Sequence, residues 1–339
     1  FLLNRSSDLR IFYLMSQKEA MWKRILFTIL AALASILLPA CSVTPASQSE
    51  TRSMTDDAGR TISAPIHPTR IVSLTYGTDE ILTSLLSPGR IAAYSKYAGD
   101  DGISFLTKDE VSRVGRTVDM EPEHILALAP DLVIASTSTP MQTVEVLTHS
   151  GIPVYVSGIP TTVEEMKGKV RGVAKAVHEE EKGEALVSDM ESKLAALASK
   201  LSAVSPDKER VALGMSFRGI LGKKGTLFSD VLRLAHVKDG AAVYEVPKGA
   251  DAYLSLEILP KIDPDVILLP TWRVKAGDDT KAFEEGLLSN PALREVTAVK
   301  ERRLVPFSEK YKYVMSQHVV DAVEAAARAV YPEVFVTSD

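Results

Sequence analysis

Short apolar runs alternate with amphipathic segments along most of this 339-residue chain. The runs are rich in Val, Ile and Leu, and clear examples occupy residues 70–74, 91–94, 152–156, 211–215 and 304–307. Each run is too short for a helix and has few polar positions, which is the pattern of a strand buried on both faces. Strands that alternate with helices in this way predict an α/β fold, with mostly parallel sheets covered on both faces.

A thirteen-residue pattern occurs twice. It is EHILALAPDLVIA at residues 123–135 and EILPKIDPDVILL at residues 257–269. In both copies a Glu precedes a Pro-Asp pair by seven residues, and the pair opens an apolar run. The run predicts a buried strand, and the segment before it predicts a short helix that ends near the Pro. We therefore predict two similar α/β lobes with a ligand cleft between them, because open α/β sheets bind ligands beyond the carboxyl ends of their strands.

Residues 161–206 predict a helical connection between the lobes. Apolar side chains recur there at spacings of three and four, as on one face of a long helix. They are Leu186, Met190, Leu194, Leu197 and Leu201. Gly168, Gly172 and Gly183 weaken the first half of this helix, so we predict a break near Gly183. Either a surface helical hairpin or a spine between the lobes fits the pattern, and we favour the spine because strand-like patterning restarts directly afterwards.

The start of the chain predicts export. Residues 21–24 are basic, and the sixteen residues at 25–40 carry no charge, which is short for a membrane span and typical of a signal peptide core. Cys41, the one cysteine in the sequence, follows Leu-Pro-Ala. This order resembles a bacterial lipoprotein signal, in which the cysteine is acylated; a cleaved signal with an incidental cysteine is the alternative. We expect translation to start at Met21.

These markers divide the chain into five predicted segments. A stretch rich in Ser, Thr and Ala after Cys41 predicts a flexible tether that lifts the folded part off a membrane. The segments are upstream residues and signal peptide at 1–40, tether at 41–68, N-terminal lobe at 69–160, spine at 161–206 and C-terminal lobe at 207–339.

The net charge of the chain restricts the kind of molecule that it can bind. Residues 1–40 carry five basic and two acidic side chains, so residues 41–339 keep 34 Lys and Arg against 42 Asp and Glu, a net charge of −8. A nucleic-acid partner calls for a basic face, so we expect none. One cysteine also excludes a disulfide framework, and stability must come from buried apolar surface. We expect a monomer.

Aromatic and basic residues follow several of the predicted strands. Such residues suit a flat or anionic ligand, because aromatic faces stack and cations pair with anionic groups. Since the carboxyl ends of parallel strands meet at one edge of a sheet, we expect these side chains to line the cleft. The predicted ligand-binding residues are Tyr76, Tyr97, Arg218, Trp272, Arg273 and Tyr313.

Enzyme motifs are missing. The sequence contains no nucleophile elbow, phosphate loop or dinucleotide fingerprint, and its six histidines show no zinc-like spacing. We therefore predict no catalytic residues, no metal site and no permanently bound cofactor. A secreted α/β enzyme without a recognisable motif is the alternative from another class, and turnover of a substrate would favour it. A purely structural lipoprotein is the third possibility, and it predicts no ligand-dependent stability.

The order of these elements resembles that of substrate-binding lipoproteins of ABC importers, in the class that carries iron-siderophores, haem and cobalamin. The similarity extends over residues 70–335. The segments that carry it are RIVSL at 70–74, the two thirteen-residue copies, GTLFSDVLRLAHV at 225–237, AVKERRLVPF at 298–307 and YPEVF at 331–335. The resemblance implies two Rossmann-like lobes joined by one long helix, with the ligand between them.

The resemblance also implies partners. Glu123 and Glu257, at matched positions of the repeat, would form salt bridges with arginines of the two permease subunits. The alternative is that each carboxylate only stabilises the positive end of a helix dipole. We expect an extracytoplasmic lipoprotein that carries an iron-siderophore complex. Cobalamin and haem stay open as ligands, and Tyr76, Tyr94 or Tyr97 could ligate haem iron. Residues 114–117 lack the Tyr-Arg pattern associated with haem-binding members.

Overall fold

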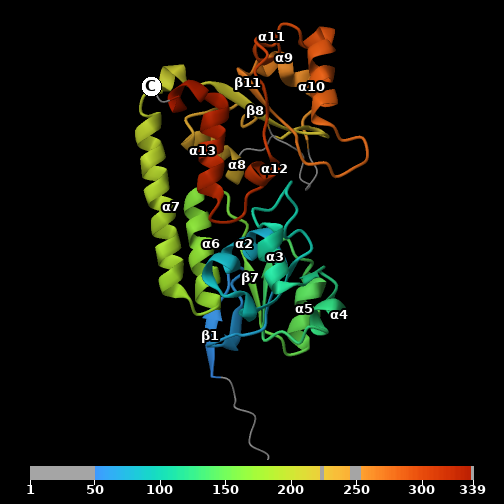
Figure 1. Ribbon diagram of the computed structural model, residues 1–339, viewed down its shortest axis with the longest axis vertical. Helices are drawn as coiled ribbons and strands as arrows, with labels where there is room; N and C mark the ends of the chain where they lie inside the picture. Colours follow the sequence, from blue (N-terminus) through green and yellow to red (C-terminus); the bar gives the residue numbers. More distant parts are fainter. Residues whose placement is uncertain (1–49, 222–224, 245–252, 337–339) are drawn as a thin grey trace, which may run out of the picture. The chain divides into compact units, whose positions relative to one another are not determined.

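The computed structural model describes residues 50–221, 225–244 and 253–336. The predicted signal peptide at residues 1–40 and the predicted acylation site Cys41 lie outside these ranges. Residues 49–339 cluster as one compact unit. Within it the chain forms two α/β lobes in succession (Figure 1).

The N-terminal lobe is built on a parallel five-stranded sheet with the order β5-β4-β3-β6-β7. Its strands are β3 (Ile71–Ser73), β4 (Ile91–Ser95), β5 (Thr117–Val118), β6 (Leu132–Ser136) and β7 (Val154–Ser157). Its helices are α2 (Tyr76–Leu85), η1 (Pro88–Arg90), α3 (Lys108–Val114), α4 (Pro122–Leu126) and α5 (Met141–His149). Both faces of the sheet are buried, so β6 is apolar at nearly every position, as its sequence predicted.

The C-terminal lobe repeats this plan. Four parallel strands have the order β10-β8-β11-β12, and β9 pairs antiparallel with β8. The strands are β8 (Val211–Ser216), β9 (Gly219–Ile220), β10 (Lys238–Asp239), β11 (Val266–Leu269) and β12 (Leu304–Pro306). The helices are α8 (Leu227–Leu234), η3 (Leu256–Ile258), α9 (Leu259–Ile262), α10 (Thr280–Ser289), η4 (Pro291–Leu293), α11 (Thr297–Lys300), α12 (Glu309–Lys312), α13 (Val319–Val330) and η5 (Pro332–Phe335).

The Asp of the repeated Pro-Asp pair forms the same backbone hydrogen bonds in both lobes. The Asp131 carboxylate accepts from Arg70 N at 2.9 Å, and Asp131 N donates to Arg70 O at 3.1 Å, just before β3. The Asp265 carboxylate accepts from Val211 N at 2.8 Å, and Asp265 N donates to Val211 O at 2.8 Å, where β8 begins. The residue before the Pro has a left-handed backbone in both copies, with φ of 44° and 48°. This residue caps α9 directly, whereas α4 already ends at Leu126, three residues earlier.

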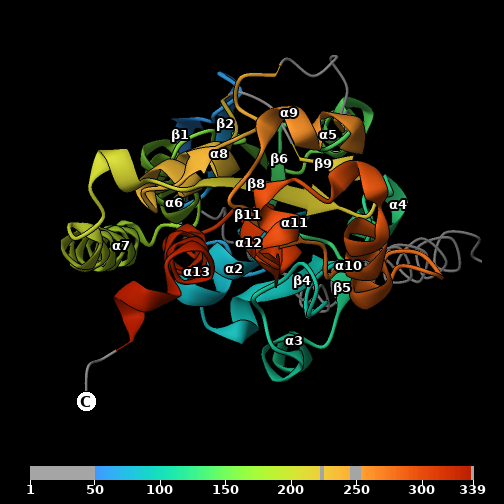
Figure 2. The same ribbon diagram turned by 90° about the horizontal axis from the view of Figure 1, so that it is seen from above.

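The lobes are joined by the antiparallel helices α6 (Val163–Ala176) and α7 (Glu180–Leu201). α7 packs against α2 of the N-terminal lobe and α13 of the C-terminal lobe, so it is the long helix that the fold prediction required (Figure 1). In the view along the long axis, α6 and α7 lie on the side opposite α4 and α10 (Figure 2). The prediction of two Rossmann-like lobes joined by a long helix is confirmed.

The helical segment is broken near Gly183, as predicted, but the break lies a few residues earlier, between α6 and α7. The turn lies at His178, whose φ of 60° reverses the chain between α6 and α7. Gly183 lies inside α7, where an added Cβ would come within 2.4 Å of the Ala174 Cβ. Glycine at this position therefore lets α6 and α7 pack closely. The two helices form a hairpin that also connects the lobes, so the segment combines both predicted alternatives.

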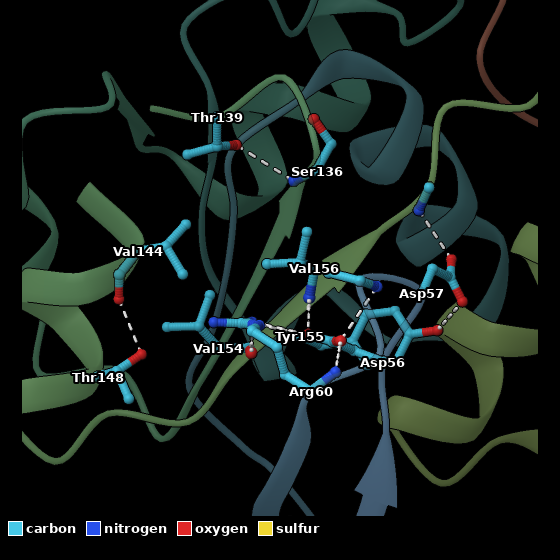
Figure 3. A network of polar contacts seen from close by, with 12 residues as sticks. Asp56, Asp57, Arg60, Ser136, Thr139, Val144, Thr148, Val154, Tyr155 and Val156 are labelled. Carbon is cyan, nitrogen blue, oxygen red and sulfur yellow. Dashed lines mark hydrogen bonds and ion pairs between the residues drawn. The ribbon is translucent and has the colours of Figure 1, made fainter. Parts of the chain in front are cut away.

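The predicted flexible tether is also wrong for residues 51–65. They form an antiparallel hairpin of β1 (Thr51–Thr55) and β2 (Thr61–Pro65). Its turn docks on β7, where Asp57 accepts from the Tyr155 hydroxyl at 3.0 Å and from Gly158 N at 2.8 Å (Figure 3). Arg60 pairs with Asp56 and donates to Val154 O. The hairpin has little apolar periodicity, because Met54 and Ala64 are its buried core residues and the polar side chains of its turn bind the sheet edge.

Asp57→Ala tests this docking. The variant leaves the buried Tyr155 hydroxyl without its acceptor, so we expect the free energy of unfolding to fall by about 2 kcal/mol. Chemical denaturation followed by circular dichroism measures the change. Asp101→Ala is the control, because the Asp101 side chain is 83% exposed. Equal stability of the two variants would contradict a docked hairpin.

Candidate functional site

A cavity of about 560 Å³ lies where the carboxyl ends of the two sheets face each other. Its N-terminal-lobe residues are Tyr76, Tyr97 and Ile103, and its C-terminal-lobe residues are Ser216, Phe217, Arg218, Tyr253, Trp272, Val274, Lys275, Asp278, Glu309 and Tyr313. This volume lies within the range of small-molecule sites, roughly 300–1,000 Å³. Aromatic rings make up much of the wall, and Arg218 and Lys275 contribute positive charge.

Two hydrogen bonds connect the opposite walls of the cavity. The Tyr76 hydroxyl donates to Tyr313 O at 2.7 Å, and Trp272 Nε1 donates to an Asp100 carboxylate oxygen at 3.2 Å. The Trp272 ring also lies against Gly102, where an added Cβ would come within 1.9 Å of the ring. Glycine is therefore required at residue 102 for the indole to reach the N-terminal lobe.

A buried ion pair holds the C-terminal-lobe wall in place. Glu309 and Lys312 lie 3.3 Å apart, and both side chains are almost fully buried. Lys312 donates to Met215 O at 2.8 Å, near the carboxyl end of β8, and to Leu269 O at 2.9 Å, at the carboxyl end of β11. Glu309 accepts from Trp272 N at 2.7 Å. Burial lowers the pKa of Lys312 to about 8, and the adjacent Glu309 carboxylate opposes this shift.

Two buried acids of α2 support the N-terminal-lobe wall. The Asp79 carboxylate accepts from Ser95 N at 3.0 Å and from the Ser95 hydroxyl at 2.6 Å, which ties the end of β4 to α2. Glu80 accepts from Phe105 N at 2.9 Å and from the Ser316 hydroxyl of the other lobe. Burial raises the pKa of Asp79 to about 7 and also raises the pKa of Glu80.

The structure brings five of the six predicted ligand-binding residues to this cavity. They are Tyr76, Tyr97, Arg218, Trp272 and Tyr313. Arg273 is the exception, because its guanidinium turns outward and pairs with Asp279 at 3.2 Å. Lys275, two residues further along, contributes the second cation of the wall.

Tyr253 and Asp278 line the cavity but were not predicted from the sequence. Tyr253 does not follow a strand of either parallel sheet; it precedes Leu254, which forms an isolated bridge with Ile220. Asp278 lies late in the long segment after β11 and accepts from Val274 N and Lys275 N. Neither residue lies directly after a strand of a parallel sheet, which is the pattern that predicted the other five.

The two matched glutamates are exposed. Glu123 lies in the first turn of α4 and Glu257 in the first turn of η3. Neither carboxylate forms a hydrogen bond or ion pair with any residue that the structure describes. Both side chains are therefore accessible to a partner.

Residues 71–311 match the family profile of the periplasmic binding proteins. The chain belongs to this family. This binding protein is similar to the putative ABC transporter substrate-binding lipoprotein YhfQ of Bacillus subtilis (strain 168), with 28% identity over 282 residues that cover 78% of this chain and 86% of YhfQ. It is also similar to the probable siderophore-binding lipoprotein YfiY of the same organism, with 24% identity over 301 residues that cover 83% of this chain and 89% of YfiY.

A solved structure has the same fold. The periplasmic heme-binding protein RhuT from Roseiflexus sp. RS-1, in apo form, superposes with a TM-score of 0.64. The two sequences are 22% identical, and the match covers 78% of this chain and 98% of RhuT. At this identity the likeness concerns the fold alone.

Family membership decides between the classes of function. This binding protein is the substrate-binding component of an ABC importer, which binds a small-molecule ligand and works with a permease. It is not an enzyme, so the alternative of a secreted α/β enzyme is excluded, and so is a purely structural lipoprotein. Within residues 50–221, 225–244 and 253–336, no helix combines the length and apolar character needed to cross a membrane.

Asp79→Asn tests the electrostatics beneath the cavity wall. The pKa of Asp79 is raised from 3.8 to about 7 in the fold, so between these values the folded protein keeps a proton that the unfolded chain releases. The stability contributed by this proton is present below about pH 4 and is lost as pH rises toward 7. We therefore expect the unfolding free energy of the variant, relative to wild type, to increase over this window.

Denaturant titrations at several pH values measure that difference. Asp101→Asn, an exposed substitution with the same loss of charge, is the control and should show no such slope. A constant difference between Asp79→Asn and wild type across the window would contradict the raised pKa.

Proposed function

We propose that this binding protein captures a ferric siderophore in the 560 Å³ cavity and delivers it to its permease. The observation that carries the proposal is the combination of aromatic rings with Arg218 and Lys275 in one wall. Ferric chelates are often anionic and present flat aromatic or hydroxamate surfaces, so cations and ring faces match them. The relative YfiY is a probable siderophore-binding lipoprotein, which supports the same ligand class.

The positions and contacts of Tyr76, Tyr94 and Tyr97 favour a siderophore over haem as the ligand. Tyr94 does not line the cavity; it is buried in the core, and its hydroxyl lies 2.7 Å from that of Thr83. The Tyr76 hydroxyl donates to Tyr313 O, and burial raises its pKa, which disfavours the tyrosinate that binds iron. Tyr97 is left as the one candidate among the three. Haem is still the ligand named for RhuT, so it is the second candidate.

The location and the partners complete the proposal. The protein acts outside the cytoplasm as a monomer, held to a membrane by an acylated Cys41. Glu123 of the N-terminal lobe and Glu257 of the C-terminal lobe bind arginines of the two permease subunits. Their exposure and their lack of partners among the described residues support this role. Their matched positions support it too, because a carboxylate that only stabilised a helix end would need no counterpart in the other lobe.

Arg218→Gln tests the cavity. Removing a cation from the wall should weaken binding of an anionic ferric tris-catecholate by about tenfold or more, because a charge-assisted contact contributes roughly 1.5–3 kcal/mol. Quenching of tryptophan fluorescence or calorimetry measures the dissociation constant. Arg273→Gln is the matched control, since it removes the same charge from a neighbouring loop and leaves the cavity wall intact. Equal effects of the two variants would place the ligand elsewhere.

The double variant Glu123→Arg/Glu257→Arg separates binding from delivery. We expect unchanged ligand affinity, because neither residue lines the cavity, and a loss of uptake, because like charges would face the permease arginines. Uptake of labelled ligand by cells is measured beside ligand titration of the purified protein. The control is Glu121→Arg/Glu295→Arg, which makes the same charge change at other exposed positions of the two lobes. Normal uptake by the first variant would contradict the docking role.

A further inference from the structure

A second, smaller cavity of about 220 Å³ adjoins the ligand cavity, and Tyr76 and Tyr97 line both. It lies at the carboxyl edge of the N-terminal-lobe sheet. Residues that follow each of the five strands contribute to it: Thr75, Tyr97, Met120, Ser138 and Ile159. This edge is where open α/β sheets bind ligands.

Lys169 reaches this cavity from α6 and is its one lysine or arginine among the described residues. The residue is only 5% exposed. Its ammonium forms no hydrogen bond and no ion pair with any residue that the structure describes. A buried cation without a partner is strongly unfavourable, so the contents of the cavity must solvate it.

The acidic groups around Lys169 are already engaged. Glu80 and Asp57 act on its charge through space and oppose the effect of burial, which lowers the pKa of Lys169 to about 8. Glu80 accepts from Phe105 and Ser316, and Asp57 accepts from Tyr155 and Gly158. Neither carboxylate pairs with the ammonium, so the place of its counter-ion is open.

Hydroxyl groups face the same cavity from the end of β6. The Ser136 and Ser138 hydroxyls lie 2.6 Å apart, and Ser138 N donates to the Ser136 hydroxyl at 3.2 Å. Thr139 accepts from Ser136 N at 3.1 Å and thereby fixes this turn (Figure 3). When the Ser136 hydroxyl donates to the Ser138 hydroxyl, the exposed Ser138 hydroxyl keeps its own proton for a ligand. A cation with adjacent hydroxyl donors is the chemistry that binds oxyanions.

We propose that this cavity is an anion subsite in which the Lys169 ammonium and the Ser136 and Ser138 hydroxyls bind a carboxylate or another small oxyanion. The group has two possible sources. It is either an anionic arm of the chelate held in the main cavity, in which case the inference rests on the proposed function, or a free small oxyanion, in which case it does not. With an anionic arm, Lys169 selects chelates by charge, because a neutral arm leaves the ammonium unpaired.

The test follows Lys169 itself by NMR, in purified protein with isotope-labelled lysine, and Lys169→Met assigns its signal. The pKa of Lys169 is measured alone, with citrate or sulfate, with ferric citrate as a carboxylate-bearing chelate, and with a neutral ferric trishydroxamate. An anion beside the ammonium must raise its pKa. A rise with ferric citrate but not with free citrate or sulfate identifies the chelate arm; a rise with the free ions identifies a free oxyanion.

Binding supplies the second readout. Lys169→Met should weaken the effective anionic probe by about tenfold or more and leave the neutral chelate unchanged. Lys175→Met, an exposed lysine of the same helix, is the matched control. Without ligand, Lys169→Met should melt at a higher temperature than wild type, because it removes an unpaired buried charge.

The two proposals fail separately. If no ferric chelate binds the wild type while a free oxyanion raises the pKa of Lys169, the siderophore proposal is wrong and the subsite stands. If the pKa of Lys169 is unchanged by every anionic probe, or if Lys169→Met binds each of them as tightly as wild type does, the anion subsite is overturned.

Discussion

Both lobes depend on one reciprocal contact, the pairing of the Asp in each Pro-Asp pair with the start of a central strand. Asp131 holds the backbone of Arg70 at β3, and Asp265 holds that of Val211 at β8. Each contact sets the register of two neighbouring parallel strands. Because parallel strands all end at one edge of a sheet, this register also decides which loops meet in the cleft.

The loops themselves are held by buried charge. Glu309 and Lys312 bind the ends of β8 and β11 and the backbone of Trp272, while Glu80 connects α2 to residues of the other lobe. A buried ion pair contributes little net stability, but removing one partner is costly, so such groups fix one arrangement. The aromatic and cationic wall is therefore positioned before a ligand arrives. Lys169 differs from these groups because its own partner is missing among the described residues.

Sequence patterns predicted those parts of the fold that depend on buried periodicity. The repeat at residues 123–135 and 257–269 predicted two lobes, and strand ends led to five cavity residues. The prediction that Arg273 lines the cavity was wrong, because a strand-end position does not determine the direction in which a side chain points. The hairpin at residues 51–65 and the burial of Lys169 beside the small cavity could not be predicted, since both depend on contacts between segments far apart in the sequence. A lysine inside an amphipathic helix has no distinctive pattern.

A ferric siderophore is the proposed ligand of the interlobe cavity. Thermal unfolding of the purified protein with ferric siderophores, haemin and cobalamin tests it most directly, because a ligand that binds only the folded state adds about 2.7 kcal/mol of stability at a hundred times its dissociation constant. We expect a rise in melting temperature with at least one ferric siderophore and little change with the other two ligands. Stabilisation by haemin or cobalamin, with none by any ferric siderophore, would contradict it.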